Sequence, residues 1–126
     1  MRKIFTVFGI LLMLTGSVWS AQSEIDTDLM QTIEDLNKSL SSNLAMKDTK
    51  AATADTKELE ELFVKVEAFY AAQGDAADAV TLSTKSKDLA QGIAKSITIK
   101  DFDAATNAAT TLSRTCKTCH NFYKKS

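Results

Sequence analysis

Proline is absent from this chain, and no other feature of the sequence restricts its fold as strongly. The 126 residues include no proline and only four glycines. Proline breaks helices and glycine weakens them, whereas the abundant Ala, Leu, Lys and Glu favour them. β-branched residues occur only in short runs, so the sequence gives little support for strands. The composition therefore predicts an all-α fold.

Apolar residues recur every three or four positions, which is the spacing of one face of a helix. The clearest example runs from Leu29 to Leu44. The pattern predicts four helices, at residues 26–46, 56–72, 76–98 and 102–124, and it predicts a loop at 47–55. Four helices with short connections favour an antiparallel four-helix bundle. No internal repeat is apparent.

Residues suited to helix ends support these boundaries. Asp55, followed three residues later by Glu58, indicates a capping box at the start of the second helix. Gly74 suits the left-handed position that follows a helix, and Asp101 can cap the fourth helix. The ends of the helices are therefore expected to be stabilised by the chain's own side chains.

The first twenty residues have the pattern of an export signal. Arg2 and Lys3 precede an almost wholly apolar stretch that ends at Leu14. Val18 and Ser20 then place small or medium-sized side chains at the −3 and −1 positions before the expected cleavage site. The sequence predicts a signal peptide at 1–20 and one domain at 21–126, with a periplasmic or otherwise exported location and no membrane association after cleavage.

Both cysteines and the only histidine of the chain fall within five residues, Cys116-Lys117-Thr118-Cys119-His120. This is Cys-x-x-Cys-His, the attachment motif of c-type haem. On a helix, positions i and i+3 project from the same side, so two thiols can bond to the two vinyl groups on one edge of a porphyrin. The following imidazole can then bind the iron. The motif predicts one covalent haem on Cys116 and Cys119, with His120 as proximal ligand.

The two cysteines allow three other interpretations. A redox dithiol of the thioredoxin type needs a βαβ context, which the sequence does not show. A structural zinc ion usually takes four ligands, and this chain offers two cysteines and one histidine. A disulfide between Cys116 and Cys119 would be sterically poor in a helix and would close almost no loop. Haem attachment is the interpretation that the sequence favours.

The position of the motif, in the last helix of an expected four-helix bundle, resembles the class II cytochromes c. This family comprises the cytochromes c′ and their low-spin relatives. Tyr123 stands where the family usually has an aromatic residue, and Lys124 stands where it often has an arginine. The resemblance implies that both side chains lie near the haem. It also suggests a homodimer packed through the first two helices.

The resemblance places the sixth iron ligand on the first helix and leaves two functions open. Low-spin relatives have a methionine there and carry electrons. Met30, near the start of the first helix, is the favoured distal ligand, and a thioether raises the potential of haem iron. Met46 is a less suitable candidate at the helix end. Cytochromes c′ instead have an apolar residue there and bind NO or CO; Leu29 or Ile33 would take that place here.

The remaining sequence favours no other function. The formal net charge is −1, which gives no basis for binding nucleic acid. No nucleophile with its base, paired carboxylates or phosphate loop is apparent, so an enzyme is not expected. Lysines 38, 47, 50 and 57 are interpreted as solvated surface. The leading expectation is an exported monohaem cytochrome that passes electrons to and from redox partner proteins.

Overall fold

The structure is a computed structural model that describes residue 25 and residues 27–123, with side chains up to residue 121. It consists of four helices: α1 (Thr27–Ala45), α2 (Thr49–Gln73), α3 (Ala77–Thr98) and α4 (Phe102–Tyr123). This part of the chain contains no strand, which confirms the all-helical expectation. The signal peptide expected at 1–20 lies outside the described residues. None of the described helices combines the length and the apolar character needed to cross a membrane.

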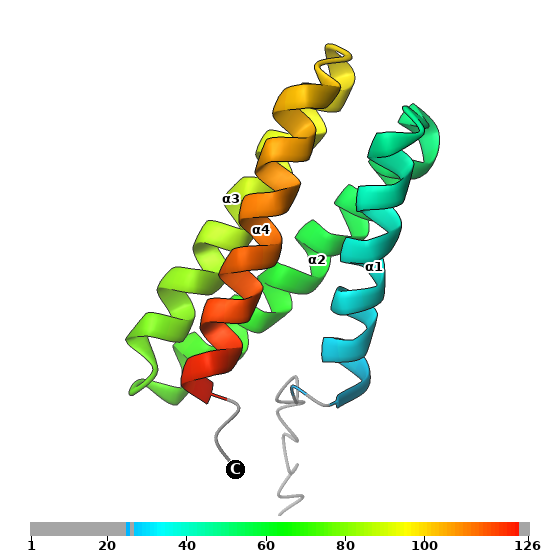
Figure 1. Cartoon of the computed structure of the whole chain (residues 1–126). Helices are drawn as coiled ribbons and strands as arrows, with labels where there is room; N and C mark the ends of the chain where they lie inside the picture. The colour runs from blue at the N-terminus through cyan, green and yellow to red at the C-terminus, as the bar shows by residue number, and fades with distance from the viewer. Residues whose placement is uncertain (1–24, 26, 124–126) are drawn as a thin grey trace, which may run out of the picture.

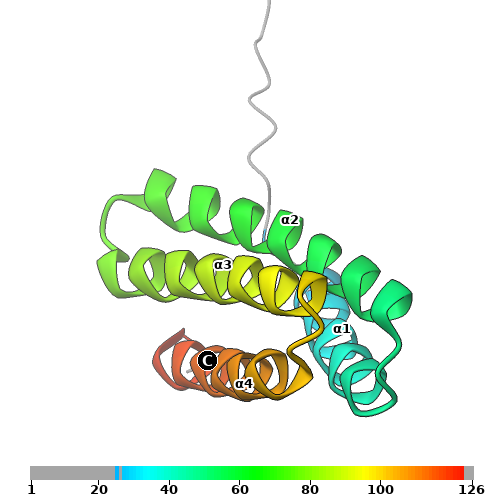
Figure 2. The ribbon, with the colours of Figure 1, turned by 90° about the horizontal axis from the view of Figure 1, so that it is seen from above.

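The helices pack in the order in which they follow one another, and α1 also contacts α4. Figure 1 shows α1 and α4 in front of α2 and α3, and Figure 2 shows the same two layers from above. Contact is most extensive between α2 and α3 and least extensive between α1 and α4. The two helices with the least mutual contact are those that carry Met30 and the Cys-x-x-Cys-His motif.

Aliphatic side chains fill the centre between the helices. The largest of the fully buried apolar residues are Leu40, Leu44, Leu59, Ile93, Ile97 and Leu112. Phe63 is the one aromatic residue in this buried core of the described chain. Ser86 is also buried, in the apolar stripe of α3, and its hydroxyl donates to the carbonyl of Leu82 at 2.8 Å. Such bonds to the preceding turn satisfy buried hydroxyl groups without a partner from another helix.

The predicted start of the second helix is wrong. Helix α2 begins at Thr49, and Asp48 is its N-cap: the carboxylate accepts a hydrogen bond from the backbone N–H of Ala51 at 3.0 Å. The alanines and threonines at 49–54 are helical because Asp48 caps the helix and satisfies one of its first backbone N–H groups. The sequence had indicated Asp55 for this role. Asp55 lies inside α2, so the expected capping box with Glu58 is also wrong.

The other boundaries agree closely with the prediction. Gly74 follows α2 in the left-handed conformation, with φ 75°. The carboxylate of Asp101 accepts a hydrogen bond from the N–H of Ala104 at 3.0 Å and so caps α4. Residue 26, the expected first position of α1, lies outside the described residues.

Two turns of the chain are built in the same way, although no repeat was expected. Lys47 after α1 and Lys100 after α3 both adopt the left-handed conformation, with φ 55° and 58°. The residue after each lysine is an aspartate that caps the next helix, and Ala-Ala-Thr follows three residues after that aspartate in both places. The backbone hydrogen bonds around the lysines also correspond. The α1–α2 pair and the α3–α4 pair can therefore be compared position by position, with Lys47 matched to Lys100.

Candidate functional site

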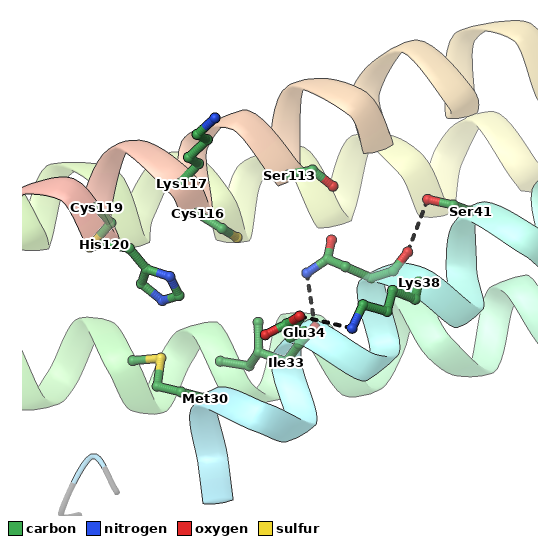
Figure 3. A pocket seen from close by; sticks show the side chains of 11 residues that line it. Met30, Ile33, Glu34, Lys38, Ser41, Ser113, Cys116, Lys117, Cys119 and His120 are labelled. Atoms are coloured by element: carbon green, nitrogen blue, oxygen red, sulfur yellow. Dashed lines mark hydrogen bonds and ion pairs between the residues drawn. The ribbon is translucent and has the colours of Figure 1, made fainter. Parts of the chain in front are cut away.

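A cavity of about 650 Å³ lies between α1 and α4. Ligand sites in proteins usually have volumes of about 300–1,000 Å³. The cavity is lined by Met30, Ile33, Glu34, Asn37, Lys38 and Ser41 from α1 and by Ser113, Cys116, Lys117, Cys119 and His120 from α4. Residues at opposite ends of the described chain thus form one site (Figure 3).

The wall formed by α4 carries the three residues of the motif. Cys116, Cys119 and His120 are all half-buried. Figure 3 shows the sulfur of Cys116 and the imidazole of His120 projecting from α4 toward α1. The helical spacing of three and four residues places these groups about one turn apart on one side of α4. The structure therefore brings the motif to the cavity and not to the outer surface of the helix.

The wall formed by α1 carries Met30 and Ile33. Met30 is half-buried and packs against the core, and Ile33 is buried. In Figure 3 the thioether of Met30 lies across the cavity from the imidazole of His120. Met46, the alternative methionine, is 65% exposed in the turn after α1 and does not line this cavity. Of the two candidate methionines, Met30 alone faces the motif.

The other end of the cavity is polar and was not predicted from the sequence. Lys38 forms an ion pair with Glu34 at 2.8 Å, and this bond together with the charge of Glu34 raises the pKa of Lys38. Both side chains remain more than half exposed, so the pair contributes little to stability. A count in steps of three and four from Met30 leads to Glu34, Lys38 and Ser41. Helical spacing was thus the signal that could have identified these residues.

Both cysteines are free thiols in the polypeptide. Burial raises the pKa of Cys116 to about 11, with a smaller contribution from the neighbouring Cys119. Burial also raises the pKa of Cys119. Because the thiolate is the reactive form of cysteine, both thiols are protonated and weakly nucleophilic at neutral pH. These environments differ from those of redox-active dithiols, whose thiol pKa values are lowered.

The structure brings together Met30, Cys116, Cys119 and His120. In the described part of the chain, no three or more His, Cys, Asp or Glu side chains are grouped so that they could hold a metal ion by themselves. For Tyr123, only the backbone at the end of α4 is described, and Lys124 lies outside the described residues. The expected position of these two side chains near a cofactor therefore stays a prediction.

Comparisons with known proteins found no match for this chain among protein families, curated proteins or solved structures.

Proposed function

We propose that this protein is an exported monohaem cytochrome of the class II type, an antiparallel four-helix bundle that carries electrons. Cys116 and Cys119 would hold the haem through thioether bonds, with His120 as the proximal ligand and Met30 as the distal ligand. Residues 1–20 would direct export and then be removed. The function is electron transfer with redox partner proteins, and no catalysis of its own is proposed.

One observation carries this proposal: Met30 and the Cys-x-x-Cys-His motif line the same cavity from opposite sides. The motif alone could occur by chance in a helix. In the fold, the Met30 thioether, from a helix far away in the sequence, lines the same cavity as the motif. Together they provide the side chains that hold a His/Met-ligated c-type haem, and the cavity has the size of a ligand site.

The residues of the chain have separate roles in this proposal. Bound haem iron would supply a one-electron couple. The Met30 thioether would raise its potential, and Ile33 would limit the access of water to the same side of the cavity. The packed helices would keep both ligands in place during electron transfer, so that little reorganisation is needed.

A second candidate function is the binding of NO or CO, which is favoured by the position of Ile33. This apolar side chain is buried and lines the cavity beside Met30. If the thioether stayed off the iron, Ile33 would face an open distal position suited to a small uncharged ligand. The two functions differ in the spin state that they require.

The proposal is tested by expressing the full chain with a periplasmic haem-attachment system and recording absorption spectra. We expect colour that persists on a denaturing gel, a low-spin spectrum in both oxidation states and no change on adding CO. Met30→Ala should convert the spectrum to high-spin and allow CO to bind. Met46→Ala is the matched control, because it removes an exposed methionine outside the cavity, and it should leave the spectrum unchanged.

The possible outcomes separate the alternatives. A high-spin wild type that binds CO would overturn electron transfer through a His/Met-ligated haem and favour gas binding. A colourless protein, or colour lost on denaturation, would overturn covalent haem attachment altogether.

A further inference from the structure

Three polar side chains join α1 to α2 beside the core. One carboxylate oxygen of Asp55 accepts a hydrogen bond from the Ser39 hydroxyl at 2.8 Å and another from the Asn43 amide at 2.7 Å. The Asn43 amide also lies 3.2 Å from the Ser39 hydroxyl. All three residues are half-buried. We call these residues, Ser39, Asn43 and Asp55, the α1–α2 clamp.

The clamp and Met30 lie on different faces of α1. Nine residues separate Met30 from Ser39, which corresponds to a rotation of about 180° and a rise of about 14 Å along the helix. The buried stripe of Ile33, Leu40 and Leu44 lies between the two faces. The face toward α2 therefore carries the clamp, and the face toward α4 carries Met30.

The corresponding positions of the other helix pair have no clamp. With Lys47 matched to Lys100, the positions of Ser39 and Asp55 are occupied by Gly92 and Ala108. These two residues instead line a groove between α3 and α4, and a Cβ added at Gly92 would meet no atom within 4 Å. The turn that connects the two helices is the same in both pairs. The clamp thus belongs to the pair that carries Met30, and the shared turn does not require it.

We propose that the α1–α2 clamp is a positioning device for the distal ligand, which sets the rotation of α1 so that the Met30 thioether faces the cavity. This inference rests on the proposed function, in which Met30 binds the iron. Ser39, Asn43 and Asp55 are not among the residues that line the cavity, so they would act on Met30 through the position of α1.

The geometry explains why such a device is needed. Aliphatic side chains pack without strong directional preference, so an apolar stripe alone tolerates small rotations of a helix. Hydrogen bonds to a carboxylate are directional and stronger than those between neutral groups. Even a small rotation of α1, one that the apolar stripe would tolerate, would misalign both hydrogen bonds to Asp55 and shift the Met30 thioether relative to His120.

The first test measures hydrogen exchange in Asp55→Ala by mass spectrometry on the purified full-length protein. We expect exchange in peptides from the first half of α1, residues 27–38, to rise about tenfold or more, because two bonds to a charged group are lost. Glu67→Ala is the matched control. Glu67 joins α2 to α3 through Thr84 at 2.7 Å and Lys87 at 2.9 Å, so its loss should leave α1 largely unaffected.

The second test is the spin state of the haem-loaded variants. Asp55→Ala should increase the high-spin fraction and CO binding, Asp55→Asn should restore much of the low-spin spectrum, and Glu67→Ala should not change it. Asn43→Ala repeats the experiment in a milder form, because the bond between Ser39 and Asp55 remains.

The outcomes distinguish this inference from the proposed function. Exchange in α1 that rises no more in Asp55→Ala than in Glu67→Ala would overturn the clamp, and so would a low-spin spectrum unchanged in Asp55→Ala and Asn43→Ala. A high-spin wild type insensitive to Met30→Ala would instead overturn Met30 ligation. The exchange measurement would then still decide whether the clamp holds α1.

Discussion

At the scale of single residues, two lysines are placed where most side chains are unfavourable. Lys47 and Lys100 have positive φ values of 55° and 58°. The left-handed conformation costs a residue with a Cβ roughly 1 kcal/mol, whereas glycine adopts it freely. Both lysines allow the chain to leave one helix and reach the aspartate that caps the next.

Lys47→Gly is therefore expected to stabilise the protein, by up to about 1 kcal/mol in the free energy of unfolding. Lys57→Gly is the control: it removes the same charge from an exposed position inside α2, where glycine should cost about 1 kcal/mol. Urea unfolding followed by circular dichroism measures both. Equal destabilisation by the two substitutions would contradict the assignment of strain to Lys47.

Glu67 is the second residue whose environment has a measurable consequence. The hydrogen bonds from Lys87 and from Thr84, in that order of importance, lower the pKa of its carboxyl group. A lowered folded-state pKa means that this carboxylate stabilises the fold above the usual carboxyl pKa of about 4.5. The contribution is lost as the pH falls through the lowered value.

We expect Glu67→Gln to reduce the free energy of unfolding by less than about 1 kcal/mol at pH 7, the range of partly exposed ion pairs. The difference should shrink as the pH falls through the lowered pKa of Glu67, because the wild-type carboxylate is then protonated as well. Urea unfolding at several pH values tests this. Glu61→Gln, at an exposed position of the same helix, controls for the change in net charge. A difference that persists unchanged at low pH would contradict the prediction.

At the scale of helices, sequence periodicity located α1, α3 and α4 within about a residue, because each has a stripe of apolar residues along most of its length, although Ser86 interrupts the stripe of α3. Periodicity failed at the start of α2. Residues 49–54 are mostly small and form no apolar stripe, so Asp48 is the one sequence signal for the start of this helix. The same error hid the role of Asp55, which was interpreted as a cap although it bonds to α1. Contacts between helices depend on how each helix is rotated against its neighbours. The apolar spacing within one helix does not specify which polar side chains will face a particular neighbour.

The candidate site was predictable only in part, because it too depends on how two helices face each other. The Cys-x-x-Cys-His motif is visible as a sequence pattern. Met30 was a candidate only through the resemblance to the class II cytochromes c, which places the sixth ligand on the first helix. The polar end of the cavity was missed, since Lys38 resembles any surface lysine when it is considered alone. Helical spacing from Met30 could place Lys38 on the same face of α1, but only the three-dimensional structure shows that α4 lies opposite this face.

At the scale of the whole molecule, the two helix pairs differ most at the interfaces that join them. Phe63 and Val66 of α2 are buried, and they correspond to Cys116 and Cys119 of α4 when Lys47 is matched to Lys100. Larger side chains thus belong to the buried core at the positions of α2 whose counterparts in α4 are thiols that border the α1–α4 cavity. The small size of the two thiols leaves space at this part of the cavity wall.

Placing the α2 residues in α4, as Cys116→Phe with Cys119→Val, should therefore fill part of the cavity. We expect this variant to be more stable than Cys116→Ser with Cys119→Ser, by about 1–3 kcal/mol from buried apolar area. Neither variant should attach haem. Urea unfolding of the two haem-free proteins makes the comparison. Lower stability of the filled variant would show that α1 and α4 cannot accommodate side chains of this size.

The sequence distance between α1 and α4 also bears on the order of folding. Helices α2 and α3 are joined by the short turn at 74–76 and share the most extensive contact, whereas Met30 and Cys116 lie near opposite ends of the described chain. Local contacts form early, and contacts between distant segments carry a larger loop-closure cost. The α2–α3 pair should therefore assemble first and the α1–α4 contact last. In this order of folding, the cavity between α1 and α4 forms only in the final step, so the bulky group of the proposed function would have to reach the thiols before α1 closes over them.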